Sequence, residues 1–266
     1  MINNYHTHTF LCDGVGEPEE YVLQALKLGC SEIGFSGHSY APWDKTCLGM
    51  DSESFLRYRD LIYKCKNKYR DIKIYCGLEL DYYSQVETDG LDFIIGAVHY
   101  VKKQNTYIPV DYSVEVLKKE ISELYNGDFY AFAKDYFNLV ADLYNKTKCD
   151  IIAHFDLITK LNKNGILFNQ SEPIYQKSAL NAVNSLAKLP CVIEVNTGGI
   201  ARGYKSSFYP DEFVLDEFAR LGKSFVLASD CHNSKNLNFG LKEARDFLDK
   251  KGYKIVNTLS QIKNNK

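Results

Sequence analysis

Asn4-Tyr-His-Thr-His-Thr9 carries two histidines, His6 and His8, in an H-x-H pair at the end of a predicted strand. Alternate residues of a β-strand point to the same side, so the pair aims two metal-ligand side chains at one place. Val226-Leu-Ala-Ser-Asp-Cys-His232 repeats this arrangement near the other end of the chain as a D-x-H pair. The chain has six histidines, and each lies at or just past the end of a short apolar run. The pattern predicts an enzyme with several bound metal ions.

The composition indicates an ordinary globular protein. Its 266 residues suit one large domain, so we expect residues 1–266 to fold as a single unit. A net charge of −2 gives no basic field for nucleic acid or an anionic membrane, and no apolar run is long enough to span a bilayer. The eight cysteines form no C-x-x-C pair, which is typical of reduced, buried thiols. With no leader segment visible, we expect a cytoplasmic protein.

Strands and helices alternate along the chain. Predicted strands cover residues 2–7, 33–36, 72–80, 93–98, 150–153, 191–195 and 225–228, with a strand-like tail at 254–256. Predicted helices cover residues 17–26, 52–68, 114–125, 129–145, 172–189, 211–221 and 241–250. This alternation favours an α/β fold with a parallel sheet inside and helices outside. Seven units favour a closed TIM-like (β/α)7 barrel, and a doubly wound open sheet is the alternative.

The distribution of histidines favours the barrel. Active sites of such barrels lie at the carboxyl ends of the strands, where all six histidines fall. A barrel gathers these ends around one mouth, whereas an open sheet spreads them along a line. The candidate metal ligands are His6, His8, Asp13, His38, Glu79, His99, His154, Asp230 and His232.

Each candidate also has a plainer interpretation. A lone histidine such as His99 is usually a core side chain, and Asp13 could be the turn residue of an Asp-Gly pair. Asp230 could cap a helix, and Asp81 competes with Glu79 on the same strand. The repetition at equivalent strand ends makes metal ligation the better interpretation, because unpaired charged groups seldom collect at one rim.

Two cations lie near the same rim. Lys160 and Arg202 could be solvated surface charges, the default for these residue types. Beside a cluster of divalent ions, however, cations are expected only where an anion also binds, which predicts a phosphate-bearing substrate. The Gly198-Gly199 turn could present backbone N–H groups to the same anion.

Several motifs together resemble the polymerase-and-histidinol-phosphatase (PHP) superfamily over nearly the whole chain, and its histidinol-phosphatase branch most closely. They are His6-Thr-His-Thr-Phe-Leu-Cys-Asp13 with Pro18-Glu19, Gly37-His-Ser39 with Pro42, Asn196-Thr-Gly-Gly-Ile-Ala-Arg202 with Tyr209-Pro210, and Asp230-Cys-His232. The resemblance implies a distorted seven-stranded barrel that holds two to three divalent metal ions.

By position, the resemblance also implies three ligand sets. They are His6, His8, Glu79 and Asp230 for one metal; Asp13, His38 and His232 for a second; and Glu79, as a bridge, with His99 and His154 for a third. Many relatives have a histidine where this chain has Asp13, and a carboxylate hardens that site. Zinc, manganese and iron all suit such mixed ligands.

The implied reaction is hydrolysis of a phosphate monoester, L-histidinol phosphate, to L-histidinol and phosphate in histidine biosynthesis. Metal-bound water would be the nucleophile, and Arg202 and Lys160 would offset the charge on the phosphate oxygens. Asp156 or His232 would protonate the leaving alcohol. Trp43 and Glu17 could contact the amine and imidazole of the substrate, or could serve loop packing and helix capping.

Other functions stay open at this point. Another phosphomonoester, such as a phosphotyrosine protein or a nucleotide, is the main alternative, while DNA ends are disfavoured by the acidic net charge. A non-catalytic metal-binding barrel should have lost some of the nine ligands. A metallohydrolase of C–N bonds would call for a lysine at the end of the third or fourth strand, where this chain has none. The identity of the metals, the oligomeric state and the segment that covers the substrate are left undetermined.

Overall fold

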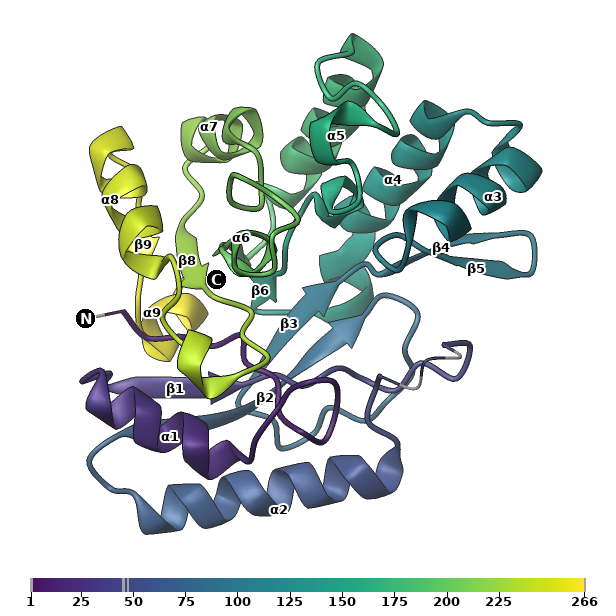
Figure 1. Cartoon of the computed structure of the whole chain (residues 1–266). Helices are drawn as coiled ribbons and strands as arrows, with labels where there is room; N and C mark the ends of the chain where they lie inside the picture. Colours follow the sequence, from purple (N-terminus) through teal and green to yellow (C-terminus); the bar gives the residue numbers. More distant parts are fainter. Residues whose placement is uncertain (1, 45, 47, 266) are drawn as a thin grey trace.

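The computed structural model describes residues 2–44, 46 and 48–265. Seven parallel strands form one curled sheet in the order β1-β2-β3-β6-β7-β8-β9, with helices packed on its outside (Figure 1). The strands of this sheet are β1 (Glu32–Phe35), β2 (Lys73–Asp81), β3 (Phe93–Ala97), β6 (Ile151–Ile152), β7 (Val192–Asn196), β8 (Phe225–Ala228) and β9 (Ile255–Val256). The α/β barrel prediction is confirmed in this distorted form.

All seven predicted helices are present, and two short helices, α6 (Gly198–Ala201) and α9 (Leu259–Lys263), which the sequence analysis does not predict, are added to them. The predicted helices are α1 (Pro18–Lys27), α2 (Ser52–Lys68), α3 (Val114–Tyr125), α4 (Phe129–Thr147), α5 (Pro173–Leu186), α7 (Glu212–Arg220) and α8 (Leu241–Lys251). Side-chain caps fix where two of them begin. The Asp51 carboxylate accepts a hydrogen bond from the Ser54 N–H before α2, and the Ser113 hydroxyl accepts one from the Val116 N–H before α3. Within the described ranges, no helix combines the length and apolar character that a membrane crossing needs.

The N-terminal stretch closes the sheet, although not as the continuous strand predicted for residues 2–7. Asn4 forms a single parallel bridge with Ile33 of β1, and Thr7 forms one with Cys231 just beyond β8. The Asn3 side chain accepts hydrogen bonds from the backbone of residues 31 and 32, so side chains replace part of the ladder. The seventh strand of the sheet is instead β9, which the sequence shows only as a strand-like tail.

A hairpin interrupts the regular alternation after β3. Its strands are β4 (Tyr100–Lys103) and β5 (Thr106–Pro109), paired antiparallel and set apart from the main sheet (Figure 1). The sequence analysis does not predict it, because its turn at Gln104 and Asn105 lacks the glycine that usually marks a two-residue hairpin. Gln104 nevertheless takes the positive φ of 53° that such a turn requires.

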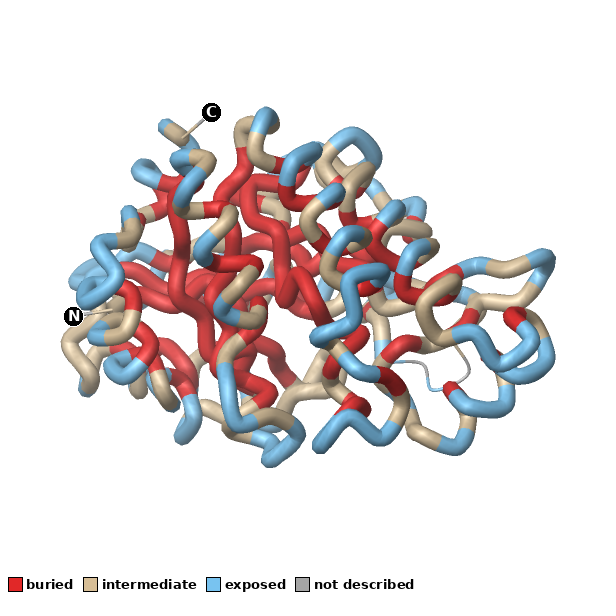
Figure 2. The backbone as a smooth tube through the Cα atoms, turned by 90° about the horizontal axis from the view of Figure 1, so that it is seen from above, coloured by how far each residue is buried: buried red, intermediate tan, exposed pale blue. Residues whose placement is uncertain are grey.

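The inside of the curled sheet holds its own apolar core. Alternate residues of the strands point inward and meet there, whereas their neighbours face the helices. This inner cluster contains Tyr5, Phe93, Ile95, Ala97, Ile151, Ala153, Val192, Val226, Val256, Leu259 and Ile262. Buried backbone accordingly gathers in the middle of the molecule (Figure 2). Glu79, Glu194 and Asn196 lie farther along β2 and β7, toward the carboxyl ends of the strands, and are also buried.

Two strand glycines make room for the largest ring of this inner core. The Phe93 ring lies over Gly77, where an added Cβ would come within 2.5 Å of it, and over Gly34, where the distance would be 2.8 Å. The Tyr5 ring meets Phe93 edge-on, with centroids 5.8 Å apart. The floor beneath the mouth of the barrel is therefore tightly packed.

We expect Gly77→Ala to lower the free energy of unfolding by about 1–3 kcal/mol, because the new methyl group overpacks the Phe93 ring. Urea unfolding followed by circular dichroism would measure the loss. Adding Phe93→Leu should make the double variant less destabilised than the sum of the two single variants. Strict additivity would show that the ring is not the obstacle.

Candidate metal centre

All nine predicted metal ligands lie together at the carboxyl ends of the strands. Their nitrogen and oxygen atoms fall into overlapping groups in which all atoms lie within 4.8 Å of one another. The groups are His8, Asp13, His38 and His232; His6, Glu79 and His154; His6, His8 and Asp230; and His38, Glu79 and His99. The H-x-H pair and the D-x-H pair meet because Thr7 and Cys231, their middle residues, bridge each other. Cys231 itself points into the core, as strand alternation predicts.

The first ligand set that the resemblance implies is His6, His8, Glu79 and Asp230, and its nitrogen atoms lie close to its carboxylate oxygens. Nε2 of His6 lies 3.3 Å from Glu79 Oε2 and 3.6 Å from Asp230 Oδ1. Nε2 of His8 lies 3.6 Å and 3.3 Å from the same two oxygens. Neighbouring ligand atoms that each lie about 2.0–2.2 Å from one zinc ion are about 3.3–3.6 Å apart, which matches these four nitrogen-oxygen distances. These four side chains therefore fit one metal ion.

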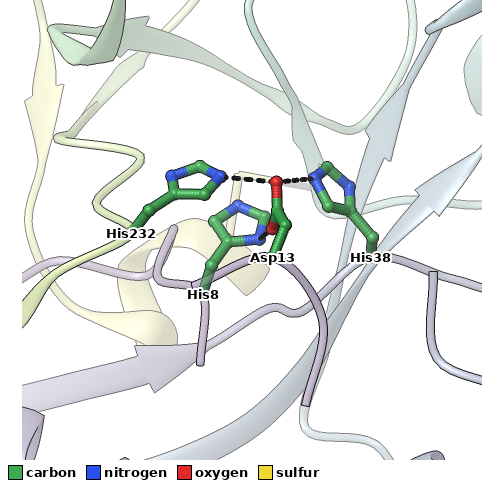
Figure 3. Close-up of side chains that lie close together, drawn as sticks. All are labelled: His8, Asp13, His38 and His232. Atoms are coloured by element: carbon green, nitrogen blue, oxygen red, sulfur yellow. Dashed lines mark hydrogen bonds and ion pairs between the residues drawn. The ribbon is translucent and has the colours of Figure 1, made fainter. Parts of the chain in front are cut away.

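The second group surrounds Asp13. Its Oδ2 lies 3.0 Å from His232 Nε2 and 3.5 Å from His38 Nε2. The two rings point at the carboxylate from opposite sides, with His8 beside it (Figure 3). Nδ1 of His8 faces the other oxygen of Asp13 at 3.3 Å. Asp13 therefore belongs to the ligand cluster and is not merely a turn residue.

Glu79 connects the remaining rings. Its Oε1 lies 2.9 Å from His154 Nε2 and 3.3 Å from His99 Nε2, while Oε2 lies 2.9 Å from His38 Nδ1. Asp81, the competing carboxylate, instead accepts hydrogen bonds from the backbone N–H groups of Tyr83 and His99 and faces His99 Nδ1 at 3.3 Å. Glu79 thus contacts rings from several of the groups, whereas Asp81 contacts the His99 ring and the backbone.

Two buried polar residues on β7, Glu194 and Asn196, contact the candidate ligands, although no sequence pattern assigned a role to either. Oε1 of Glu194 lies 2.6 Å from His6 Nδ1, and its Oε2 accepts hydrogen bonds from the backbone N–H of His154 and from Asn196 Nδ2. Asn196 Nδ2 also reaches Asp230 at 3.3 Å. The E-x-N spacing at the end of a strand is the same signal as H-x-H and could have identified them.

Unpaired buried atoms test whether this arrangement suits metal ions. Among the described residues, His6 Nε2, His8 Nε2 and Glu79 Oε2 are buried side-chain atoms that no well-aligned hydrogen bond satisfies, although ion-pair contacts of 2.9–3.6 Å involve all three. A buried polar group left unsatisfied costs about 1–3 kcal/mol, so three that converge on one place imply a further binding partner. Imidazole nitrogens and a carboxylate oxygen are donors that zinc, manganese and iron accept. The residues present therefore fit a divalent cation.

The charges of the site also favour a bound cation. Burial alone lowers the pKa of His6, but the carboxylates of Glu194, Glu79 and Asp230 outweigh it and raise that pKa to about 10. Burial raises the pKa of Glu79, yet the surrounding rings, His38 foremost, hold it well below its usual value. The carboxylates are therefore ionised and attract positive charge, from protons or from metal ions.

A cavity of about 790 Å³ opens over these clusters, a size that suits a small molecule. Trp43, Lys160 and Arg202 line it, as predicted for substrate-binding residues. Arg202 Nη2 lies 2.8 Å from Asp230 Oδ2, and Lys160 Nζ lies 2.7 Å from Asp111 Oδ2. The Gly198 N–H donates to the Asn196 side chain at 2.8 Å, so it is not free to receive an anion as the sequence analysis expected.

Two predicted site residues are not brought to the cavity. Glu17 is exposed at the start of α1, where it forms a capping box with Glu20, so the helix-capping alternative fits it better than substrate binding. Asp156 is fully buried and accepts a hydrogen bond from the Asp211 N–H. Burial raises the pKa of Asp156 to about 7, which nearby Lys205 opposes and Asp211 reinforces. Neither residue is among the described residues that line the cavity.

Known proteins are similar to this chain in both sequence and fold. The histidinol-phosphatase of Bacillus subtilis is 27% identical over 258 residues, which covers 88% of this chain and 94% of that protein. The crystal structure of hisK from Listeria monocytogenes matches with a TM-score of 0.78 at 21% identity, over 91% of this chain and 99% of that one. These matches span nearly the full length of both partners.

A second crystal structure gives a similar result. Histidinol phosphate phosphatase of Lactococcus lactis, complexed with Zn, L-histidinol and phosphate, matches with a TM-score of 0.70 at 19% identity, over 96% of this chain and 95% of that one. At such identities the structural likeness shows the fold alone. The family model described as the PHP domain matches residues 4–198, from the H-x-H pair to just past Asn196. This match covers well over half of the sequence, and the chain belongs to the PHP domain family.

Proposed function

We propose that this chain is a phosphoric monoester hydrolase that converts L-histidinol phosphate to L-histidinol and phosphate with two to three divalent metal ions. The observation that carries the proposal is the convergence of nine candidate metal-ligand side chains, seven of which line a cavity that Lys160 and Arg202 also line. The names of the full-length relatives support the choice of substrate. Zinc, manganese and iron all fit the mixed nitrogen and oxygen donors.

The distances support the following ligand roles. His6, His8, Glu79 and Asp230 would hold one ion; Asp13, His38 and His232 a second; and Glu79 with His99 and His154 a third. Such ions bind phosphate oxygens and lower the pKa of a bound water, which supplies the nucleophile. Glu194 would fix the His6 ring through its Nδ1 and so direct Nε2 toward the first ion.

The two cations would act on the phosphate. Arg202 reaches over the ligand cluster because Asp230 accepts hydrogen bonds from both its Nη1 and Nη2, which holds the planar guanidinium beside the ions. Asp111 holds the Lys160 ammonium at the cavity wall in the same way. Of the two proton donors considered for the leaving alcohol, His232 lines the cavity and Asp156 does not. Because Nε2 of His232 faces Asp13 in the second ligand set, the proton would come from its Nδ1.

The cytoplasm is the compartment that we propose. All seven cysteines that the structure describes are free thiols, and most of them are buried, as in proteins of reducing compartments. Cys47 lies outside the described residues. The substrate is a small molecule on this proposal, in keeping with the size of the cavity and the net charge of −2.

The first experiment tests the function itself. We expect phosphate release from L-histidinol phosphate that stops after treatment with EDTA and returns when zinc, manganese or iron is added back, because the cavity floor needs its ions to bind phosphate. EDTA already saturated with zinc is the control. A panel with a phosphotyrosine peptide and nucleoside monophosphates would separate the other candidate substrates. Full turnover by metal-depleted protein, or none on histidinol phosphate with metal present, would refute the proposal.

A second prediction concerns Glu194. We expect Glu194→Gln to weaken metal binding about 10–100-fold, because the neutral amide no longer orients and polarises the His6 ring. Competition against a chromogenic chelator would measure the affinity. Glu243→Gln, at an exposed position on α8, is the matched control. Equal affinities for the Glu194 variant and the wild type would rule out this role.

A third prediction concerns Arg202. We expect Arg202→Ala to lower kcat/KM about a hundredfold at saturating metal, because a charge that stabilises the phosphate oxygens is lost. Steady-state phosphate release would measure it. Arg220→Ala, which removes an exposed arginine paired with Glu217 on α7, should leave kcat/KM unchanged. An unchanged rate in the Arg202 variant, with metal bound, would assign the phosphate contacts to other groups.

A further inference from the structure

The cavity has a second part beyond the metal ligands and the two phosphate-side cations. Trp43, from the loop after β1, stacks on Tyr107 of the hairpin, with ring centroids 4.4 Å apart and planes 11° from parallel. Tyr100 of the same hairpin meets Trp43 edge-on at 5.9 Å. All three rings line the cavity. Together they form an aromatic wall, by which we mean Trp43, Tyr100 and Tyr107.

This wall is held from behind. Tyr83 packs edge-on against both Trp43 and Tyr107, at 6.1 Å and 5.2 Å. The Tyr83 hydroxyl accepts a hydrogen bond from the Lys102 N–H, and the Lys102 ammonium lies 4.7 Å over the Tyr107 ring. The loop after β1 is thereby joined to the hairpin β4–β5. Flat rings fixed in this way form a preorganised surface for a planar or cationic group.

Helix α3 adds a carboxylate to the same cavity. Val116 and Glu120, one helical turn apart, both line it, while Leu117 and Ile121 bury the other side of the helix in the core with Ile108 of the hairpin. Two side chains of α3 therefore face the cavity, and one of them, Glu120, is ionisable.

Glu120 differs from the other carboxylates in the lining that are not proposed metal ligands. Asp111 pairs with Lys160, and Asp81 accepts two backbone hydrogen bonds. Asp44 accepts hydrogen bonds from the backbone and side chain of Thr46. For Glu120, the described part of the chain provides no hydrogen bond or ion pair. An ionised group in a partly enclosed cavity gains from a positive partner, and here the substrate can supply it.

We propose that Glu120 and the aromatic wall form the subsite for the leaving alcohol, in which Glu120 binds an ammonium group of the substrate. This inference rests on the proposed phosphatase function. It adds that substrates are selected by an ammonium group on their alcohol part. The phosphate-side cations Lys160 and Arg202 are already paired with Asp111 and Asp230, so neither of them occupies Glu120. An amino alcohol phosphate carries its charges in the matching order, phosphate at one end and ammonium at the other.

The test compares two variants on two substrates. The variants are Glu120→Gln and the matched control Glu123→Gln, which changes an exposed glutamate on the same helix. The substrates are L-histidinol phosphate and its deaminated analogue, the phosphate of 3-(imidazol-4-yl)propan-1-ol. We expect Glu120→Gln to lower kcat/KM for histidinol phosphate about tenfold or more, mainly through KM, because a charge-assisted contact is lost. Turnover of the analogue should stay within about twofold of the wild type.

The outcomes separate this inference from the function on which it rests. An equal loss on both substrates, or no loss on either, would overturn the role of Glu120 while leaving the phosphatase function intact. If the wild type does not hydrolyse histidinol phosphate but hydrolyses other monoesters, the proposed function fails. The comparison is then made between 2-aminoethyl phosphate and propyl phosphate, which differ in the ammonium group. If Glu120→Gln lowers kcat/KM for 2-aminoethyl phosphate but not for propyl phosphate, the result supports the subsite. If it does not, the result refutes the subsite.

Discussion

The buried carboxylate of Glu79 is the constraint on which the rest of the structure depends. A lone ionised carboxylate in a protein interior costs several kcal/mol, so it persists only where positive charge surrounds it. Five histidine rings lie within 3.6 Å of its two oxygens, and they come from the N-terminal H-x-H pair and from the ends of three later strands. Only a parallel sheet curled on itself brings those strand ends to one point. The curled shape of the sheet is therefore what brings the histidines around the Glu79 carboxylate.

The positions of the metal ligands could be predicted from the sequence because two simple regularities control them. Side chains alternate along a strand, and the ends of parallel strands meet at one rim, so an H-x-H or D-x-H pair after an apolar run is informative without any tertiary information. The same regularities apply to Glu194 and Asn196, which escaped notice because an acid within an apolar run resembles an ordinary strand residue.

What could not be predicted depends on contacts between distant residues. Glu17 lies close in sequence to the ligands, yet the cap of α1 turns it to solvent. Asp156 follows His154 by two positions, but its backbone has already left the strand, and its carboxylate meets Asp211 instead of the cavity. The hairpin β4–β5 has no glycine in its turn, so its tyrosines gave no sign that they would face Trp43. Catalytic ligands come from strand ends, whereas the walls that select a substrate come from loops and insertions, where sequence patterns are weakest.

The closure of the barrel by the stretch that carries the H-x-H pair has a consequence for how the protein matures. Asp13 and His232 are 219 positions apart, and the bridge between Thr7 and Cys231 forms only when both ends of the domain are present. On a growing polypeptide, the first histidines to emerge from the ribosome must wait for almost the entire domain before their partners exist. The two ligand sets that include Asp230 or His232 would therefore stay incomplete until synthesis is nearly finished, and a prematurely terminated product would lack both residues. Only a chain that extends through His232 can therefore form the complete centre.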